Sequence, residues 1–141
     1  MKKIKYLLLI SILALTVGCF KSDKEYTYKA ANTKEDIKVT INSDYKLSDS
    51  EPIKVTKGDE EVASIIFITK TNFDEVKALF ADKTLVALKE GKNGNNEFYM
   101  YKVSEDYNYL IAIDGTTTAA AITAKSEDTI NKITEIIKFS K

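Results

Sequence analysis

The first nineteen residues constrain the fold most, because they separate a short apolar segment from the chain that forms the folded body. Three lysines among the first five residues precede an apolar run at 6–17, which stops at Gly18 and Cys19. A helix that spans a bilayer needs about 20 apolar residues, so this run is too short to cross one. A basic start, an apolar centre and small residues before a cleavage point are typical of a secretory signal peptide. We therefore expect residues 1–18 to be removed.

The segment Leu15-Thr16-Val17-Gly18-Cys19 resembles the lipobox of bacterial lipoproteins. Gly18 is the small residue before the cleavage point, and Cys19, the single cysteine, would become the new N-terminus. Thr16 stands where the lipobox usually has leucine, with Leu15 one place early. The resemblance implies diacylglycerol on the Cys19 thiol, an acyl group on its amine, and no other cofactor. Two acyl chains hold a protein durably, whereas a single myristoyl chain binds membranes with a constant of about 10⁴ M⁻¹.

The resemblance also implies a location: the cell membrane, on its extracytoplasmic face and held by lipid. Phe20, rather than aspartate, follows Cys19. This resembles a signal for the outer membrane if the host has two membranes. Two alternatives stay open for the segment. One is a soluble secreted protein with an unpaired thiol, which oxidation outside the cell disfavours, and the other is an uncleaved membrane helix.

Composition limits what the remaining 123 residues are able to do. This length suits one compact domain. After residues 1–18 are removed, 18 lysines face 21 acidic residues, a net charge of −3, so nucleic acid is not an expected partner. The chain has no histidine and no arginine, and Cys19 is its only thiol. Ser-His-Asp and Cys-His catalysis and imidazole or thiolate zinc sites are therefore excluded.

Carboxylates are the groups that still allow catalysis or metal binding. The acidic segment 59–61 and the asparagine-rich segment 93–97 do not follow the spacing of a calcium loop, so we interpret both as solvated turns and expect no metal site. A glycoside hydrolase needs two acids about 5 to 10 Å apart. The acids are spread over turns and helix starts, which gives no reason to select a pair, and we do not expect an enzyme.

The polar segment 19–36 is expected to be a lipidated N-terminus and tether. Within it, Tyr26 and Tyr28 alternate with polar residues and are compatible with a first edge strand. We expect a single domain over 37–141. The strands expected from alternation, apolar runs and turn residues are 37–41, 53–56, 62–69, 84–88, 97–103, 107–113 and 116–124.

Further expectations concern two of these strands and one connecting segment. The run Ile65-Ile66-Phe67-Ile68 is continuously apolar, which predicts a central strand covered on both faces. Residues 91–96 are expected to form a loose polar loop. Segment 116–124 is ambiguous, because its threonines favour a strand and its alanines a helix. The Asp114-Gly115 dipeptide before it predicts a two-residue hairpin turn, so we prefer a strand.

Two helices are expected. In the first, Thr71 or Asn72 caps the start, Asp74 and Glu75 lie in the first turn, and an apolar stripe follows. Its members are Phe73, Val76, Leu79 and Phe80. The second helix is capped by Ser126, with Glu127 and Asp128 in its first turn. Its apolar positions are Ile130, Ile133, Ile136 and Ile137.

The order of elements predicts an α+β domain with a mostly antiparallel β-sheet and two helices packed on one face. This order, and the ending in which a capped helix runs into Ile136-Ile137-Lys138-Phe139-Ser140, resembles the PsbP/Mog1 group of small α+β domains over residues 36–139. Several members of that group are bacterial lipoproteins. The early tryptophan and proline of that group are absent here, and Asp44-Tyr45 stand in their place.

Four tyrosines form the candidate partner-binding surface. Tyr99 and Tyr101 alternate on one expected strand, and Tyr107 and Tyr109 on the next. The flat apolar body and polar tip of tyrosine suit stacking on a sugar or contact with a protein. The alternative is ordinary cross-strand packing. The register decides between them: with Tyr101 opposite Ile111 all four share one face, and a shift by one residue separates them.

These observations predict a small membrane-anchored envelope lipoprotein with a non-catalytic binding or accessory role. The expected partners are the membrane, through the lipid, and an envelope protein or a glycan. The alternative function is an inhibitor or immunity lipoprotein that blocks a hydrolase or a toxin. A hydrolase that uses carboxylates is the third interpretation.

Overall fold

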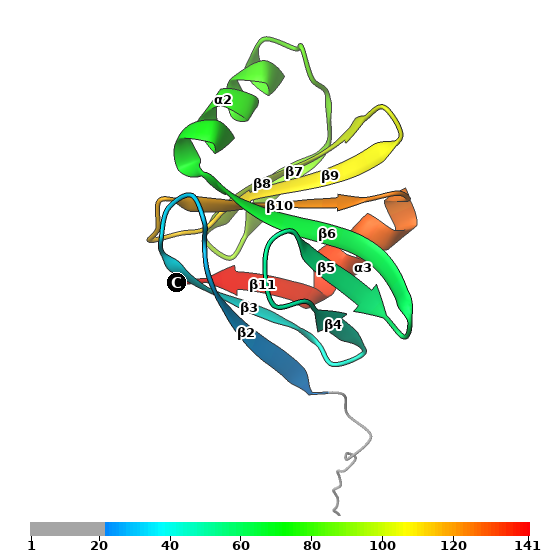
Figure 1. Ribbon diagram of the computed structural model, residues 1–141. Helices are drawn as coiled ribbons and strands as arrows, with labels where there is room; N and C mark the ends of the chain where they lie inside the picture. Colours follow the sequence, from blue (N-terminus) through cyan, green and yellow to red (C-terminus); the bar gives the residue numbers. More distant parts are fainter. Residues whose placement is uncertain (1–21) are drawn as a thin grey trace, which may run out of the picture.

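The computed structural model describes residues 22–141 (Figure 1). Expectations for Gly18 and Cys19 fall outside these residues. The elements in chain order are β2 (Asp23–Lys29), β3 (Asp36–Asn42), β4 (Tyr45–Leu47), β5 (Ile53–Lys57), β6 (Glu60–Thr69), α2 (Lys70–Ala81), β7 (Ala87–Asn93), β8 (Asn96–Val103), β9 (Asp106–Ala112), β10 (Thr118–Ala124), α3 (Glu127–Ile136) and β11 (Ile137–Ser140).

The strands form two antiparallel sheets. The large sheet has seven strands in the order β4-β5-β6-β10-β9-β8-β7, and the small sheet has three in the order β11-β3-β2. In Figure 1, α2 lies above the large sheet, and the small sheet lies below it. We call the face of the large sheet toward α2 the outer face and the face toward the small sheet the inner face. The α+β class with a mostly antiparallel sheet is confirmed.

Each helix covers a different face of the large sheet, whereas the sequence predicted both on one face. Phe73 of α2 packs with Tyr99 and Leu110 on the outer face. Ile130 and Ile133 of α3 belong to the cluster between the two sheets. Strand residues alternate between faces, so a sheet with apolar residues on both sides needs a cover on each. The small sheet and α3 together form one cover, and α2 forms the other.

The main core lies between the inner face and the small sheet. Side chains that are less than 2% exposed come from both sheets and from α3, and they include Ile37, Ile41, Ile53, Ile65, Phe67, Met100, Ile111, Ile122, Ile130 and Ile133. The alternation in β3 predicted this burial, since its odd residues point inward and its even residues outward. The small sheet therefore supplies one side of the core.

The N-terminal segment differs from the expected tether. Residues Asp23–Lys29 form β2, which pairs with β3 along its full length. Tyr28 is only 7% exposed, and its hydroxyl donates to the Ser48 carbonyl oxygen at 2.7 Å. The alternation of Tyr26 and Tyr28 indicated a first edge strand, and β2 is an edge strand of the small sheet. Its polar outward residues give the segment the composition of a tether. The folded domain thus begins at or before Asp23 rather than at residue 37.

Strand β6 is interior, but it is not covered on both faces. Ile65 and Phe67 are buried on the inner face, while Ile66 on the outer face is 42% exposed. The prediction of two covered faces was wrong at Ile66. The reason is that α2 covers only part of the outer face. Segment 116–124 does form a strand, β10, which pairs with both β6 and β9.

Helix and turn boundaries shift by a few residues from those expected. Thr69 caps α2, accepting from the Asn72 amide at 3.1 Å, so Asp74 and Glu75 lie beyond the first turn. In the second helix, Ser126 caps α3 as predicted. Ile137, however, starts β11 and pairs with Ile41. Backbone amides and carbonyls of β11 form hydrogen bonds with β3, and these replace the bonds that another helical turn would have made.

Two connections also differ. The expected loop at 91–96 is mostly strand, since β7 continues to Asn93 against β8, with an irregularity near Leu88. Asp114 and Gly115 sit inside a five-residue connection and not in a two-residue hairpin turn. Gly115 has a φ of +77°, which glycine adopts at little cost. The antiparallel pairing that this turn predicted is nevertheless present.

Candidate functional site

The four tyrosines do not share one face. The β8–β9 register places Tyr101 opposite Asn108 and Met100 opposite Tyr109. Residues directly opposite each other in an antiparallel pair point to the same side. Tyr99 and Tyr101 therefore lie on the outer face with α2, and Tyr107 and Tyr109 lie on the inner face. The single four-tyrosine patch is not formed.

The outer pair packs against helix α2. The Tyr99 ring stacks on Phe80 with centroids 4.7 Å apart and planes 7° apart, and Tyr101 meets the same ring edge-on at 5.3 Å. Burial raises the pKa of Tyr101. The Tyr99 hydroxyl donates to a Glu97 carboxylate oxygen at 3.1 Å. Both rings therefore serve to hold α2 on the sheet.

The inner pair also makes packing contacts. Tyr109 is 3% exposed and packs on Phe98 with centroids 5.1 Å apart. Burial raises the pKa of Tyr109, while a hydrogen bond with the Asn93 side chain opposes this effect. Tyr107 is partly exposed, and the Lys102 ammonium lies 5.1 Å from its ring centroid. The contacts of Tyr107 and Tyr109 match the cross-strand packing alternative, whereas the outer pair packs against helix α2.

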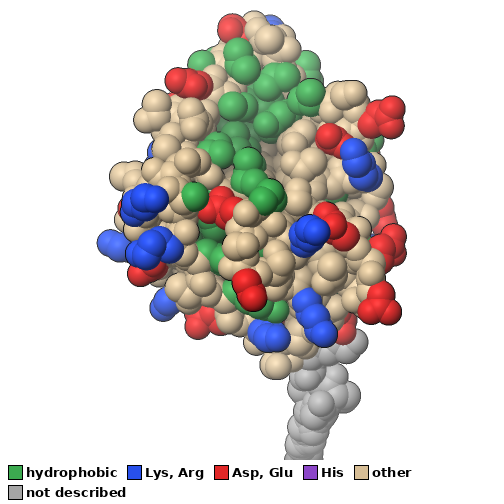
Figure 2. All heavy atoms as spheres, viewed as in Figure 1, with side chains coloured by type: hydrophobic (Ala, Val, Ile, Leu, Met, Phe, Trp, Pro, Cys, Tyr) green, Lys and Arg blue, Asp and Glu red, His purple; other side chains and the backbone are tan. Residues whose placement is uncertain are grey.

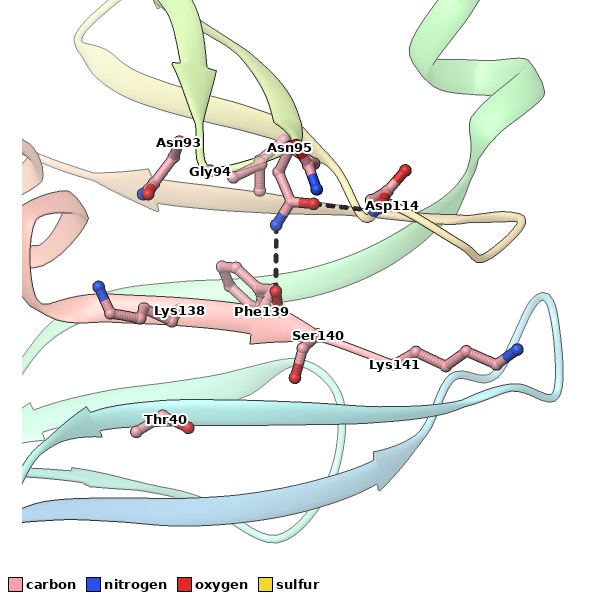
Figure 3. Close-up of a pocket in the computed structure, with 11 residues that line it drawn as sticks. Thr40, Asn93, Gly94, Asn95, Asp114, Lys138, Phe139, Ser140 and Lys141 are labelled. Atoms are coloured by element: carbon pink, nitrogen blue, oxygen red, sulfur yellow. Dashed lines mark hydrogen bonds between the residues drawn. The ribbon is translucent and has the colours of Figure 1, made fainter.

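A pocket of about 570 Å³ lies where the β7–β8 turn meets the small sheet (Figure 3). The turn and the flanking ends of its strands supply one wall, strands β11 and β3 the other, and the β9–β10 connection closes one end. The lining residues are Thr40, Asn93, Gly94, Asn95, Asn96, Ile111, Asp114, Lys138, Phe139, Ser140 and Lys141. We call this space the inter-sheet pocket.

Asn96 joins the walls of the inter-sheet pocket. Its side-chain amide donates to the Phe139 carbonyl oxygen at 3.0 Å, and its side-chain oxygen accepts from the Asp114 backbone amide at 2.8 Å. Figure 3 shows both bonds. One side chain thus links β8, the edge strand β11 and the β9–β10 connection. These two hydrogen bonds of Asn96 fix the position of the large sheet relative to the small sheet at the pocket.

The lining of the pocket is about equally polar and apolar. Lys138 and Lys141 contribute ammonium groups, and Figure 3 shows Lys138 on the same side as Asn93 with Lys141 on the other. Asp114 supplies the one side-chain carboxylate among the lining residues. Phe139 is only 4% exposed, but apolar atoms still make up about half of the pocket lining. The pocket is suited to a ligand that carries several hydrogen-bonding groups and negative charge.

The sequence did not predict this pocket, because the pattern of residues 93–97 indicated a solvated turn. The segment contains three asparagines around Gly94, and that density of amide side chains is the one available signal. Nothing local indicates that the turn reaches Phe139, which lies 43 residues after Asn96.

Two glutamates clamp the β2–β3 hairpin onto the large sheet. Glu35 accepts from the Thr117 amide and hydroxyl, both at 2.9 Å, and from the Thr118 hydroxyl. Glu51 accepts from the Phe67 amide at 2.8 Å and from the Ala31 amide at 3.0 Å. Each carboxylate accepts from a backbone amide that lies just past the last paired residue of two neighbouring strands, so this amide does not stay without a partner. These contacts give both glutamates a structural role.

A charged contact joins α2 to β8 on the outer face. The Lys77 ammonium lies 3.0 Å from a Glu97 carboxylate oxygen. Burial acts to raise the pKa of Glu97, but hydrogen bonds from Lys77 and Tyr99 and the charges of Lys77 and Lys92 outweigh it, so the pKa is lowered. The ion pair is partly exposed, which limits its contribution to stability.

Exposed apolar side chains gather near the β7 edge. Val86 is 75% exposed, Leu88 50% and Val103 47%, and Ile66 is a fourth on the outer face. Figure 2 shows hydrophobic side chains collected at the end of the molecule that carries α2. This is the end opposite the start of β2 in Figure 1.

Residues 22–141 hold no cluster of three or more acidic or thiol side chains able to bind a metal ion. Within the same residues, no helix combines the length and apolar character needed to cross a membrane. No protein-family model, curated protein or solved structure matches the chain. The resemblances to bacterial lipoproteins and to the PsbP/Mog1 group stay predictions.

Proposed function

We propose that this protein is a lipoprotein of the bacterial envelope, anchored by acylated Cys19, whose domain binds a hydroxylated acidic ligand such as an acidic sugar. The observation that carries the binding role is the inter-sheet pocket. Its volume of about 570 Å³ lies within the roughly 300–1,000 Å³ of small-molecule sites. The role is non-catalytic, and the lipid keeps the binding domain at the membrane.

The side chains of the pocket define the ligand class. Asn93 and Asn95 each offer an amide that donates and accepts, which suits hydroxyl groups. Lys138 and Lys141 provide two cations for a carboxylate or a phosphate. Lysine acts as a hydrated point charge and lacks the fork of arginine, so we expect modest affinity that falls with salt.

The start of β2 supports the anchored arrangement. Strand β2 begins at Asp23, four residues after Cys19. An extended chain spans at most about 3.6 Å per residue, so Asp23 lies within about 14 Å of an acylated Cys19. The domain would therefore stand directly on the membrane surface, without the tether over residues 19–36 that the sequence predicted.

The binding role is tested by calorimetric titration of the protein with glucuronic acid and with glucose. We expect binding of the acid, weaker binding of the neutral sugar, and a loss of at least about fivefold for Lys138→Ala or Asn93→Ala. Lys102→Ala, which removes a lysine outside the pocket, is the matched control. Equal affinities for all variants, or binding of neither sugar, would refute the assignment of the pocket.

The anchor is tested by mass spectrometry of the mature N-terminus and by detergent phase partition. We expect an acylated cysteine at position 19 and partition into the detergent phase. Cys19→Ser should move the protein into the aqueous phase. An unmodified thiol, or a serine variant that stays membrane-bound, would contradict the lipoprotein assignment.

The exposed apolar side chains near β7 favour a protein partner as a second candidate, in line with an inhibitor or immunity role. Three of the four large apolar side chains exposed in residues 22–141 are Val86, Leu88 and Val103. Cross-linking in intact membranes tests this candidate. It predicts adducts to another protein at 86–88 and 103, and adducts spread evenly over the surface would argue against it.

A further inference from the structure

Strand β7 is a free edge of the large sheet. It is the last strand in the order and pairs only with β8. Five of its seven residues are exposed, and within residues 22–141 neither Glu90 nor Lys92 forms a salt bridge. A row of unpaired backbone amides and carbonyls is a template for another strand.

Charge selects the register in which a second copy fits this edge. Two identical strands pair antiparallel about a two-fold axis perpendicular to the sheet, so opposite residues come from the same face. A register centred on Lys89 or on Glu90 sets like charges directly opposite each other, which is destabilising. A register centred on Gly91 instead sets Glu90 opposite Lys92 of the second copy, and this favourable pair occurs twice.

We propose that two copies of this protein pair through β7, antiparallel and centred on Gly91, to form one continuous sheet. Gly91 brings no side chain to the two-fold axis, and glycine in a strand suits close approach of another backbone. Leu88, which is 50% exposed, comes to lie beside Gly94 of the second copy. A Cβ atom added at Gly94 would meet nothing within 4 Å, so that position has room for a neighbour.

The pairing also adds a residue to the inter-sheet pocket. Lys89 lies opposite Met100 on the inner face, and Asn93 lies on the same face opposite Asn96. In the register centred on Gly91, Lys89 falls opposite Asn93 of the second copy. Each copy thus places a third ammonium group at the edge of its neighbour's pocket. This consequence rests on the proposed ligand-binding function, whereas the pairing itself does not.

The symmetry agrees with anchoring in one membrane. A two-fold axis perpendicular to the large sheet keeps both inner faces on one side. The small sheet and the start of β2 lie on that side (Figure 1), so the two copies of β2 begin on the same side of the continuous sheet. A single strand edge buries little surface, which predicts weak association in solution. Confinement to a membrane raises the effective concentration and favours the dimer.

Energy transfer in lipid vesicles tests the pairing. The mature lipoprotein is labelled at its C-terminus with donor or acceptor, and both forms are incorporated together. We expect transfer above that of a random distribution. Glu90→Lys and Lys92→Glu should each weaken association about tenfold, because each sets like charges opposite one another twice. The double variant E90K/K92E restores the opposite charges and should restore transfer.

Lys54→Glu, a reversal on strand β5 far from β7 in the sheet order, is the matched control and should behave as wild type. Random-level transfer for the wild type, equal transfer for all variants, or a double variant as weak as the single ones would overturn the proposal. Mass spectrometry of Cys19 and glucuronic acid titration of each variant are read separately. If Cys19 is acylated and glucuronic acid still binds but no pairing is seen, the dimer is refuted while the proposed function stands.

Discussion

The Glu35 carboxylate binds both the backbone amide and the hydroxyl of Thr117, a residue 82 positions later in the chain. This contact closes the tip of the small sheet onto the β9–β10 connection of the large sheet. The Thr33 and Thr118 hydroxyls, 2.6 Å apart, extend the same network. The two sheets are thus joined by specific polar contacts at one end and by the apolar core between them.

Glu35→Gln is expected to lower the thermal midpoint at neutral pH, and the difference from wild type should vanish in acid. The Thr118 hydroxyl is the main cause that lowers the pKa of Glu35; burial opposes it, and the Thr117 hydrogen bonds and Lys141 assist it. A lowered folded-state pKa stabilises the protein above the ordinary value of 4.5, and this stabilisation is lost as pH falls through the folded-state value. Thermal melts from pH 7 to pH 2 measure it. A constant difference across this range would contradict the account.

Asn96→Ala should destabilise the protein by about 2 kcal/mol, because it removes two hydrogen bonds worth about 1 kcal/mol each. The loss should appear as faster amide exchange in β11, whose Phe139 carbonyl Asn96 holds. Asn95→Ala in the same turn is the control, with an expected change under about 0.5 kcal/mol. Equal exchange in both variants would show that Asn96 does not fix β11.

Tyr109→Ala is expected to cost about 3–5 kcal/mol of unfolding free energy, as for other large buried aromatic residues. The side chain is 3% exposed and packs against Phe98. Tyr107→Ala, at a partly exposed position on the same face, should cost much less. Denaturant unfolding measures both. A Tyr109 variant with unchanged stability would restore the interpretation of this tyrosine as a partner-binding residue.

Neighbouring isoleucines in β6 offer a test of the two faces. Ile65→Ala should cost about 2–5 kcal/mol, because its side chain is fully buried in the main core. Ile66→Ala should cost under about 1 kcal/mol, because Ile66 is 42% exposed. Chemical denaturation of the two variants under one condition gives the comparison. A similar loss of unfolding free energy at both positions would mean that other side chains bury Ile66 in solution.

Local chemistry was enough to predict much of the domain. The alternation in β3 predicted the burial of Ile37, Val39 and Ile41, and Ser126 predicted the start of α3. These signals depend on a strand period of two and on a single capping oxygen, both of which lie within a few residues. The candidate site was less predictable, since the inter-sheet pocket joins Asn96 to Phe139 across the two sheets.

The sequence by itself determined the α+β class, most of the strands and the two helices, because periodicity, caps and turn residues act over short distances. Tertiary structure alone decided that Tyr99 and Tyr109 face opposite sides, since a shift of one residue in register reverses every side chain of a strand. It also decided that Ile137 joins β11 and that the polar segment after Ser22 pairs with β3 as part of the folded domain. In both cases β3 supplies the backbone hydrogen bonds, and no pattern within either segment indicates which partner will provide them.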